Sequence, residues 1–96
     1  MADIYVPYAG KKPASLFING HKVIILSTNP EMFEGDLEVI GADNIKLLKS
    51  LNTPQEQEKA LTKLAKKSHA GVVLSPLGME LNELIKNLEH ELPWVQ

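Results

Sequence analysis

The stretch that decides the fold reads Leu16-Phe17-Ile18-Asn19-Gly20-His21-Lys22-Val23-Ile24-Ile25-Leu26. Asn-Gly between two apolar runs is the strongest short-range signal for a β-hairpin, because both residues tolerate the positive φ angles of a type I′ turn. The predicted cross-strand pairs are Ile18–His21, Phe17–Lys22 and Leu16–Val23. The second arm does not alternate in polarity, so we expect it to be buried on both faces at the centre of a sheet.

Outward from the hairpin, apolar and turn patterns predict short strands and helices along the rest of the chain. The hairpin arms span 14–18 and 22–27, and further strands are predicted at 4–6, 37–40 and 71–74. The predicted helices are a single turn at 31–34, a short helix at 44–51, a longer one at 54–67 and a last one from Ser75-Pro76 to Pro93. Pro7 directly follows the first strand, so we expect that strand to end early or to lie at a sheet edge.

Thr53-Pro54-Gln55-Glu56 carries the strongest helix-start pattern in the chain. Thr53 can accept a hydrogen bond from the Glu56 amide while Glu56 reaches back to the amide of Thr53. Proline at the first helical position costs nothing, because no amide hydrogen is needed there. The helix that follows is acidic at its start and ends in Lys66 and Lys67, which suits its macrodipole.

This order of elements predicts an α+β or small α/β domain. A strand at 37–40, a pair of helices and a strand at 71–74 would form a right-handed parallel crossover. The N-terminal β-hairpin adds antiparallel strands to the same sheet. The expected architecture is a mixed β-sheet of about four or five strands packed against two or three helices, in one globular domain over residues 1–96.

Length and composition exclude several classes of protein. The chain has 96 residues, of which 44% are apolar and 23% charged, as in an ordinary soluble domain. A formal net charge of −2 and the lack of arginine argue against a surface devoted to nucleic acid. The lack of cysteine removes disulfides and thiolate sites. Because no signal-peptide pattern and no long apolar run occurs, we expect a cytoplasmic protein without a membrane partner.

No sequence pattern assigns catalysis or a cofactor. His21, His69 and His90 lack the His-x-x-x-His spacing of a zinc site. The chain also has no Gly-x-Ser-x-Gly elbow and no glycine-rich phosphate loop. We therefore expect a protein that is not an enzyme and that binds neither a metal nor a cofactor.

The most site-like stretch is Ser75-Pro76-Leu77-Gly78, where the strand at 71–74 leads into the last predicted helix. Helix N-termini bind anions, and ligands of open α/β sheets gather at the carboxyl ends of strands. Ser75 and Gly78 are therefore candidate ligand-binding residues for a small anion or a phosphorylated metabolite. The alternative is that Ser75 only caps the helix, as serine does at ordinary helix starts.

A basic face is predicted on the helix at 54–67. Its members are Lys59, Lys63, Lys66 and Lys67, which lie opposite the apolar positions Leu61 and Leu64. Such a face could bind nucleic acid weakly, but it has no interleaved aromatic residue for stacking and no arginine for reading bases. A solvated surface is the usual role of a lysine-rich face, so nucleic acid is not the expected partner.

The last predicted helix has more apolar positions than one narrow stripe requires. The candidate interface residues are Met79, Leu81, Ile85, Leu88 and Trp94. An extra apolar flank on a small domain favours self-association, most simply as a homodimer with one self-complementary patch. The alternative for Trp94 is that it folds back and covers the core. The expected function is a non-catalytic protein-interaction or regulatory module that works through the last helix and the hairpin.

Overall fold

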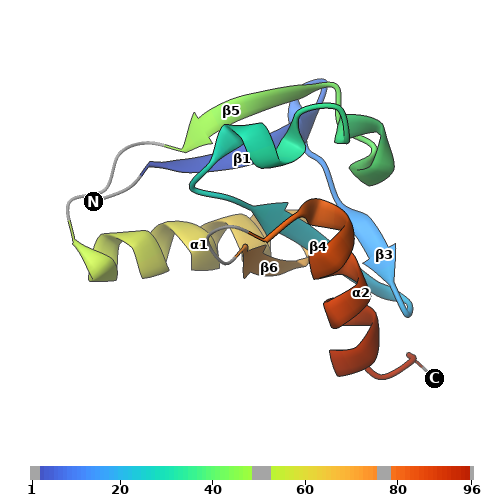
Figure 1. Cartoon of the computed structure of the whole chain (residues 1–96). Coiled ribbons are helices and arrows are strands. Elements are labelled where there is room, and N and C mark those ends of the chain that lie inside the picture. Colours follow the sequence, from blue (N-terminus) through green and yellow to red (C-terminus); the bar gives the residue numbers. More distant parts are fainter. Residues whose placement is uncertain (1–2, 49–52, 76–78, 96) are drawn as a thin grey trace.

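The computed structural model describes residues 3–48, 53–75 and 79–95, and Figure 1 shows how their helices and strands are arranged. In chain order the strands are β1 (Ile4–Ala9), β2 (Lys12–Pro13), β3 (Leu16–Ile18), β4 (His21–Leu26), β5 (Asn44–Leu48) and β6 (Gly71–Leu74). The 3₁₀-helices η1 (Pro30–Phe33) and η2 (Leu37–Ile40) follow β4. The α-helices are α1 (Pro54–Ser68) and α2 (Leu81–Glu91).

The strands form two three-stranded sheets. One has the order β2-β1-β5 and is antiparallel. The other has the order β3-β4-β6, in which β3 is antiparallel and β6 parallel to β4. Among the described residues one bridge joins the sheets: Tyr5 N donates to Ser27 O at 2.7 Å, and Ser27 N donates to Tyr5 O at 3.2 Å. The predicted α+β class with an N-terminal hairpin is confirmed, although two sheets replace the single one that we expected.

The β3–β4 hairpin has the predicted turn and register. Asn19 and Gly20 have φ angles of 54° and 85°, and the pairs are Leu16–Val23, Phe17–Lys22 and Ile18–His21. All four residues of Val23–Leu26 are buried, and their side chains alternate between two apolar clusters. The expectation that β4 is the buried central strand of its sheet is therefore confirmed.

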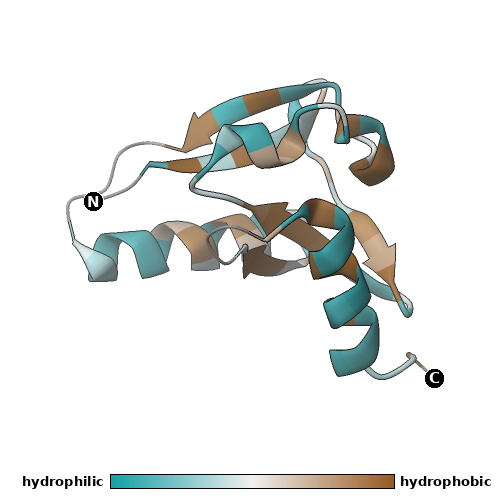
Figure 2. Cartoon of the chain, in the orientation of Figure 1, coloured by the Kyte–Doolittle hydropathy of each residue, from teal (hydrophilic) through white to brown (hydrophobic). Residues whose placement is uncertain are grey.

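The two clusters lie on opposite faces of β4. On one face, α2 packs its leucines on Val23, Ile25 and the deeply buried Phe33. On the other face, α1 and β1 cover Ile24 and Leu26. Figure 2 shows β4 as hydrophobic along most of its length. In α2, Leu81, Leu84 and Leu88 are buried, Ile85 is half-buried and the polar residues are exposed. The apolar residues of α2 are thus concentrated on the side that faces the sheet.

Two predicted elements have the wrong type. Residues 37–40 form the 3₁₀-helix η2 instead of a strand, and residues 44–48 form β5 instead of a helix. The predicted helix at 44–51 continued into residues that lie outside the described ranges. The free edge of β1 gives Asn44–Leu48 a partner along its whole length, from the pair Ile4–Leu48 to the pair Tyr8–Asn44. Because a ladder with β1 outweighs weak local propensity, the segment is extended.

These changes also alter the predicted crossover. With no strand at 37–40, β6 lies parallel to β4, and the pairs run from Val23–Gly71 to Leu26–Leu74. The connection between the two parallel strands contains η1, η2, β5 and α1. The long connection thus leaves the sheet of β4, adds a strand to the other sheet and returns through α1.

Pro7 lies in the middle of β1, so the expectation that this strand ends early or lies at an edge is wrong. The strand continues to Ala9 and is central in its sheet. Tyr5 N donates to Ser27 on the side away from β5, and hydrogen-bonding direction alternates along a strand. The nitrogen of Pro7 therefore faces the same side as Tyr5, outside the β1–β5 ladder, and Pro7 O there accepts from Ala14 N at 2.9 Å.

The start of α1 is confirmed, whereas the start of α2 is wrong. Thr53 Oγ1 accepts from Glu56 N at 3.2 Å, and Pro54 opens α1 as predicted. By contrast, α2 begins at Leu81, with Glu80 at its N-cap, instead of at Ser75-Pro76. Among the described residues, no helix is long and apolar enough to cross a membrane.

Candidate functional site

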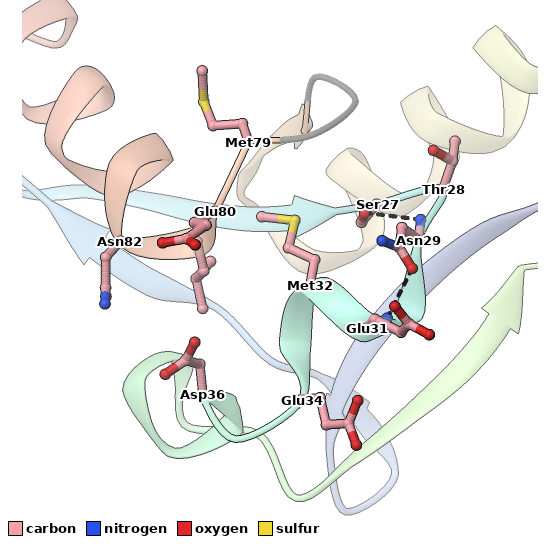
Figure 3. Close-up of a pocket in the computed structure, with 11 residues that line it drawn as sticks. Ser27, Thr28, Asn29, Glu31, Met32, Glu34, Asp36, Met79, Glu80 and Asn82 are labelled. Atoms are coloured by element: carbon pink, nitrogen blue, oxygen red, sulfur yellow. Dashed lines mark hydrogen bonds between the residues drawn. The ribbon is translucent and has the colours of Figure 1, made fainter.

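The candidate site is a cavity of about 420 Å³ at the carboxyl end of β4. Figure 3 shows that its walls come from the segment after β4, from η1 and from the start of α2. We call it the acidic pocket. Its described lining residues are Ser27, Thr28, Asn29, Glu31, Met32, Glu34, Asp36, Met79, Glu80, Leu81 and Asn82. Because β4 and β6 are parallel, the carboxyl ends of both strands point toward this side of the molecule.

Short-range hydrogen bonds shape the β4 side of the acidic pocket. Ser27 Oγ accepts from Asn29 N at 3.0 Å, and Asn29 Oδ1 accepts from Glu31 N at 3.0 Å. The second bond caps the N-terminus of η1, which forms where a helical turn at 31–34 was predicted. These bonds hold the backbone that carries the carboxylate of Glu31 at the pocket wall (Figure 3).

The charge of the acidic pocket is negative. Its described lining contains the carboxylates Glu31, Glu34, Asp36 and Glu80 and no lysine. Figure 3 shows Asp36 and Glu80 on one side of the pocket, and Glu31 and Glu34 on the other. Such a lining repels anions, so the acidic pocket does not suit a phosphorylated metabolite.

The last helix does not start at Ser75. Ser75 follows β6, is buried, and donates from its backbone N to Leu26 O at 2.8 Å. Gly78, the other residue of the predicted anion site, lies outside the described residues. Since α2 begins only at Leu81, the helix N-terminus on which the anion prediction depended is not at Ser75. The N-terminus of α2 thus gives no support to an anion site at Ser75 and Gly78, which stays a prediction.

Two of the predicted interface residues belong to the core. Leu81 and Leu88 are buried, so they are not available to a second molecule without unfolding. Met79 and Ile85 are half-buried and pack against the same core cluster. Trp94 is the only residue of this predicted set that is largely exposed, at 75%. The apolar surplus of the last helix is therefore mostly used within the chain, because α2 packs on the sheet in one core cluster with residues of η1 and η2.

The C-terminal tail is tied to the hairpin turn. Asn19 O accepts from Val95 N at 2.9 Å, and Asn19 Nδ2 donates to Leu92 O at 2.6 Å and Glu89 O at 2.9 Å. His21 Nε2 donates to Pro93 O at 2.7 Å. Figure 1 shows the C-terminal end beside the turn of β3 and β4. Thus the backbone on both sides of Trp94 is fixed while its side chain remains in solvent.

We use the name tail surface for Trp94 and Val95 together with the adjoining hairpin turn. Val95 is 56% exposed, and Phe17 on the neighbouring strand β3 is 70% exposed. The sequence analysis predicted protein contacts through the last helix and the hairpin. The tail surface lies where these two elements meet. Sequence reasoning named Trp94 but missed Asn19 and His21 as the residues that hold it.

The predicted basic face is present on α1. Lys59, Lys63, Lys66 and Lys67 are all exposed, and they lie opposite Leu61 and Leu64, which pack on the sheet. No group of three or more His, Asp or Glu side chains among the described residues could hold a metal ion. Of the histidines, His21 is engaged with the tail, and His69 ends α1 in a left-handed conformation with φ 51°.

Asp43 has a structural role. Gly10 N donates to both carboxylate oxygens of Asp43, to Oδ2 at 3.1 Å and to Oδ1 at 3.2 Å. The Asn44 side chain also donates to Oδ1. These bonds tie the β1–β2 turn to the start of β5. These hydrogen bonds, with that from Asn44 contributing most, lower the pKa of the Asp43 carboxyl below its ordinary value.

Comparison with protein-family models, curated proteins and solved structures finds no match to this chain. The function must therefore be argued from these surfaces alone.

Proposed function

We propose that the protein is a non-catalytic protein-interaction module that binds another protein through the tail surface. The observation that carries this proposal is an exposed tryptophan whose neighbouring backbone is fixed. Tryptophan is enriched among the residues that dominate binding energy at interfaces. A segment whose backbone is fixed before binding loses less conformational entropy when a partner covers it.

The arrangement of the tail favours docking over coverage of the core. Trp94 was expected either to cover the core or to contact a partner, and its 75% exposure supports the second role. If the tail served only to close the hairpin, the hydrogen bonds from Asn19 and His21 would suffice without a large aromatic side chain. The tail surface thus supports the hypothesis of protein contacts through the last helix and the hairpin.

The test compares three versions of the full chain as bait in an extract: wild type, Trp94→Ala and Val39→Ala. Val39 is the matched control, because it is 52% exposed on η2, an element that takes no part in the tail surface. We expect an identified partner to bind wild type and Val39→Ala alike and to bind Trp94→Ala roughly tenfold more weakly or worse. Equal affinities for all three versions would refute the proposal.

Fluorescence gives a second readout of the same interaction. The chain has one tryptophan, so its emission reports directly on the tail surface. Burial of the Trp94 indole by the partner should shift the emission of wild type to shorter wavelength in titrations with the identified partner. Binding without any change in emission would place the contact elsewhere on the molecule.

Weak nucleic-acid binding through the basic face is the second candidate, and the exposure of its four lysines supports it. Binding of RNA or DNA that weakens steeply with salt, and that is lost in Lys59→Ala/Lys63→Ala, would favour this function. The third candidate, an anion-binding domain that uses Ser75 and Gly78, gains no support from α2, which begins at Leu81.

A further inference from the structure

The turn of the β3–β4 hairpin carries the pair of residues that is most prone to spontaneous covalent change in this chain. Asparagine is a thermolabile residue, because its side-chain amide can be attacked by the backbone nitrogen of the residue that follows it. A following glycine makes this attack easiest, since it has no side chain to shield its nitrogen. Asn19 is the only asparagine of the chain that precedes a glycine.

The structure requires glycine at position 20 for two reasons. The φ angle of Gly20 is 85°, in the region where any other residue type is strained. A Cβ atom at Gly20 would also lie only 3.0 Å from Val95 Cβ, so a side chain there would displace the tail. The labile pair is therefore part of both the turn and the docking site of the tail.

The docked tail keeps Asn19 out of the reactive geometry. Ring closure needs the Gly20 nitrogen beside Asn19 Cβ, whereas the left-handed conformation of Asn19, with φ 54°, holds that nitrogen roughly opposite Cβ across the Cα–C bond. Asn19 Nδ2 donates to Leu92 O at 2.6 Å and to Glu89 O at 2.9 Å, and Asn19 O accepts from Val95 N at 2.9 Å. Rotation into the reactive geometry breaks these bonds, so the reaction requires a local opening in which the tail undocks.

We propose that Asn19 is a deamidation site that reacts when the tail undocks, and that the reaction then prevents the tail from docking again. In the open turn, Gly20 N loses its proton to hydroxide and attacks Asn19 Cγ. A bond forms between these two atoms, the Cγ–Nδ2 bond breaks, and the amide group takes a proton from water and leaves as ammonia. Water then opens the cyclic succinimide at either carbonyl, which leaves an aspartate or an isoaspartate at position 19.

Neither product can hold the tail as the amide does. A carboxylate has no N–H to donate, and its negative charge would face Glu89 O and Leu92 O at the C-terminal end of α2, where the helix dipole is also negative. In the isoaspartate the main chain runs through the former side chain, which adds a backbone atom to the turn. The reaction is thus a one-way release of the tail. This inference does not depend on the proposed partner, because it concerns only how long the tail surface stays intact.

The test incubates the full chain at mildly alkaline pH and follows deamidation of Asn19 by peptide mapping with mass spectrometry. Folded wild type should react many-fold more slowly than the same chain unfolded in urea. His21→Ala removes the donor to Pro93 O and should react several-fold faster than wild type. Lys22→Ala is the matched control and should react at the wild-type rate, because Lys22 is the next residue of β4, is exposed and points to the opposite face from His21. Equal rates in folded and unfolded wild type would refute the proposal.

Two further measurements keep the proposal testable if circular dichroism shows that His21→Ala unfolds. Val95→Gly removes the side chain that covers Gly20 and should also react several-fold faster than wild type. Folded variants that react no faster than wild type would show that the tail does not control the reaction. Fully deamidated wild type should have a Trp94 fluorescence anisotropy as low as that of Asn19→Asp. An anisotropy equal to that of the unreacted protein would overturn the release of the tail.

Discussion

Asn19 offers the sharpest test of how the tail is held, because its side chain and its backbone make separable contributions. Asn19→Gly keeps a residue that adopts a φ of 54° without strain, so the turn itself is preserved. The substitution deletes the amide that donates to Leu92 O and Glu89 O. Only the link between the hairpin turn and the end of α2 is removed.

The expected loss follows from the two hydrogen bonds. Each contributes about 0.5–1.5 kcal/mol net to stability, and the bond to Glu89 is exposed. We therefore expect the free energy of unfolding to fall by about 1–2 kcal/mol, and Tm by roughly 4–8 °C for each kcal/mol. The tail should also become more mobile, because Leu92 O, just before the tail, would lose its donor.

Urea unfolding followed by circular dichroism measures the stability, and the fluorescence anisotropy of Trp94 measures the motion of the tail. Asn19→Asp is the matched control, since it keeps the shape and the tolerance of positive φ but has no side-chain N–H to donate. Both variants should lose stability and anisotropy. If Asn19→Gly unfolds at the wild-type urea concentration with unchanged anisotropy, the side-chain amide does not hold the tail.

Two further predictions concern a cap and a carboxylate. Thr53→Ala should lower the free energy of unfolding by roughly 1 kcal/mol through loss of the acceptor for Glu56 N, measured by urea unfolding with Thr53→Ser as control. Asp43 has a folded-state pKa below its ordinary value of 3.8, so its contribution to stability is present above that pH and is lost as pH falls through the folded-state pKa. In acid titrations Asp43→Asn should therefore lose less stability than wild type below about pH 4; identical acid profiles would contradict this role.

The elements that could be predicted from the sequence have local causes. Asn19 and Gly20 determine the register of β3 and β4, because only residues that accept positive φ complete a two-residue turn. Thr53 and Pro54 determine the start of α1 through groups within one helical turn. For both elements, the residues that form the sequence pattern also make the turn or the capping hydrogen bond.

The elements that could not be predicted depend on distant partners. The residues of β5 satisfy a helical pattern about as well as an extended one, and pairing with β1 decides between them. Ser75-Pro76 has the local chemistry of a helix start, but Ser75 N bonds to Leu26 across the sheet, and α2 begins only at Leu81. The local sequence around β5 and Ser75 does not indicate that β5 pairs with β1 or that Ser75 bonds to Leu26.

The acidic pocket was missed for a related reason. Glu31, Glu34 and Asp36 lie within one short segment after β4, and an acidic run after a buried strand is a signal that a sequence reader could have used. Glu80 joins them only because β6 lies parallel to β4 and delivers the chain to the same end of the sheet. The negative charge of the site thus depends on topology.

The parallel pairing of β4 with β6 also has a consequence for biosynthesis. Val23 pairs with Gly71, so 48 residues of chain (71 − 23) separate the partners. At ribosomal rates of about 5–20 residues per second, on the order of 2–10 s pass between the synthesis of the two strands. During that interval β4, whose Val23–Leu26 stretch is buried in the folded protein, has one edge without its neighbour, which is a hazard for aggregation. The nascent chain, more than the folded protein, is therefore the state in which a chaperone has most to protect.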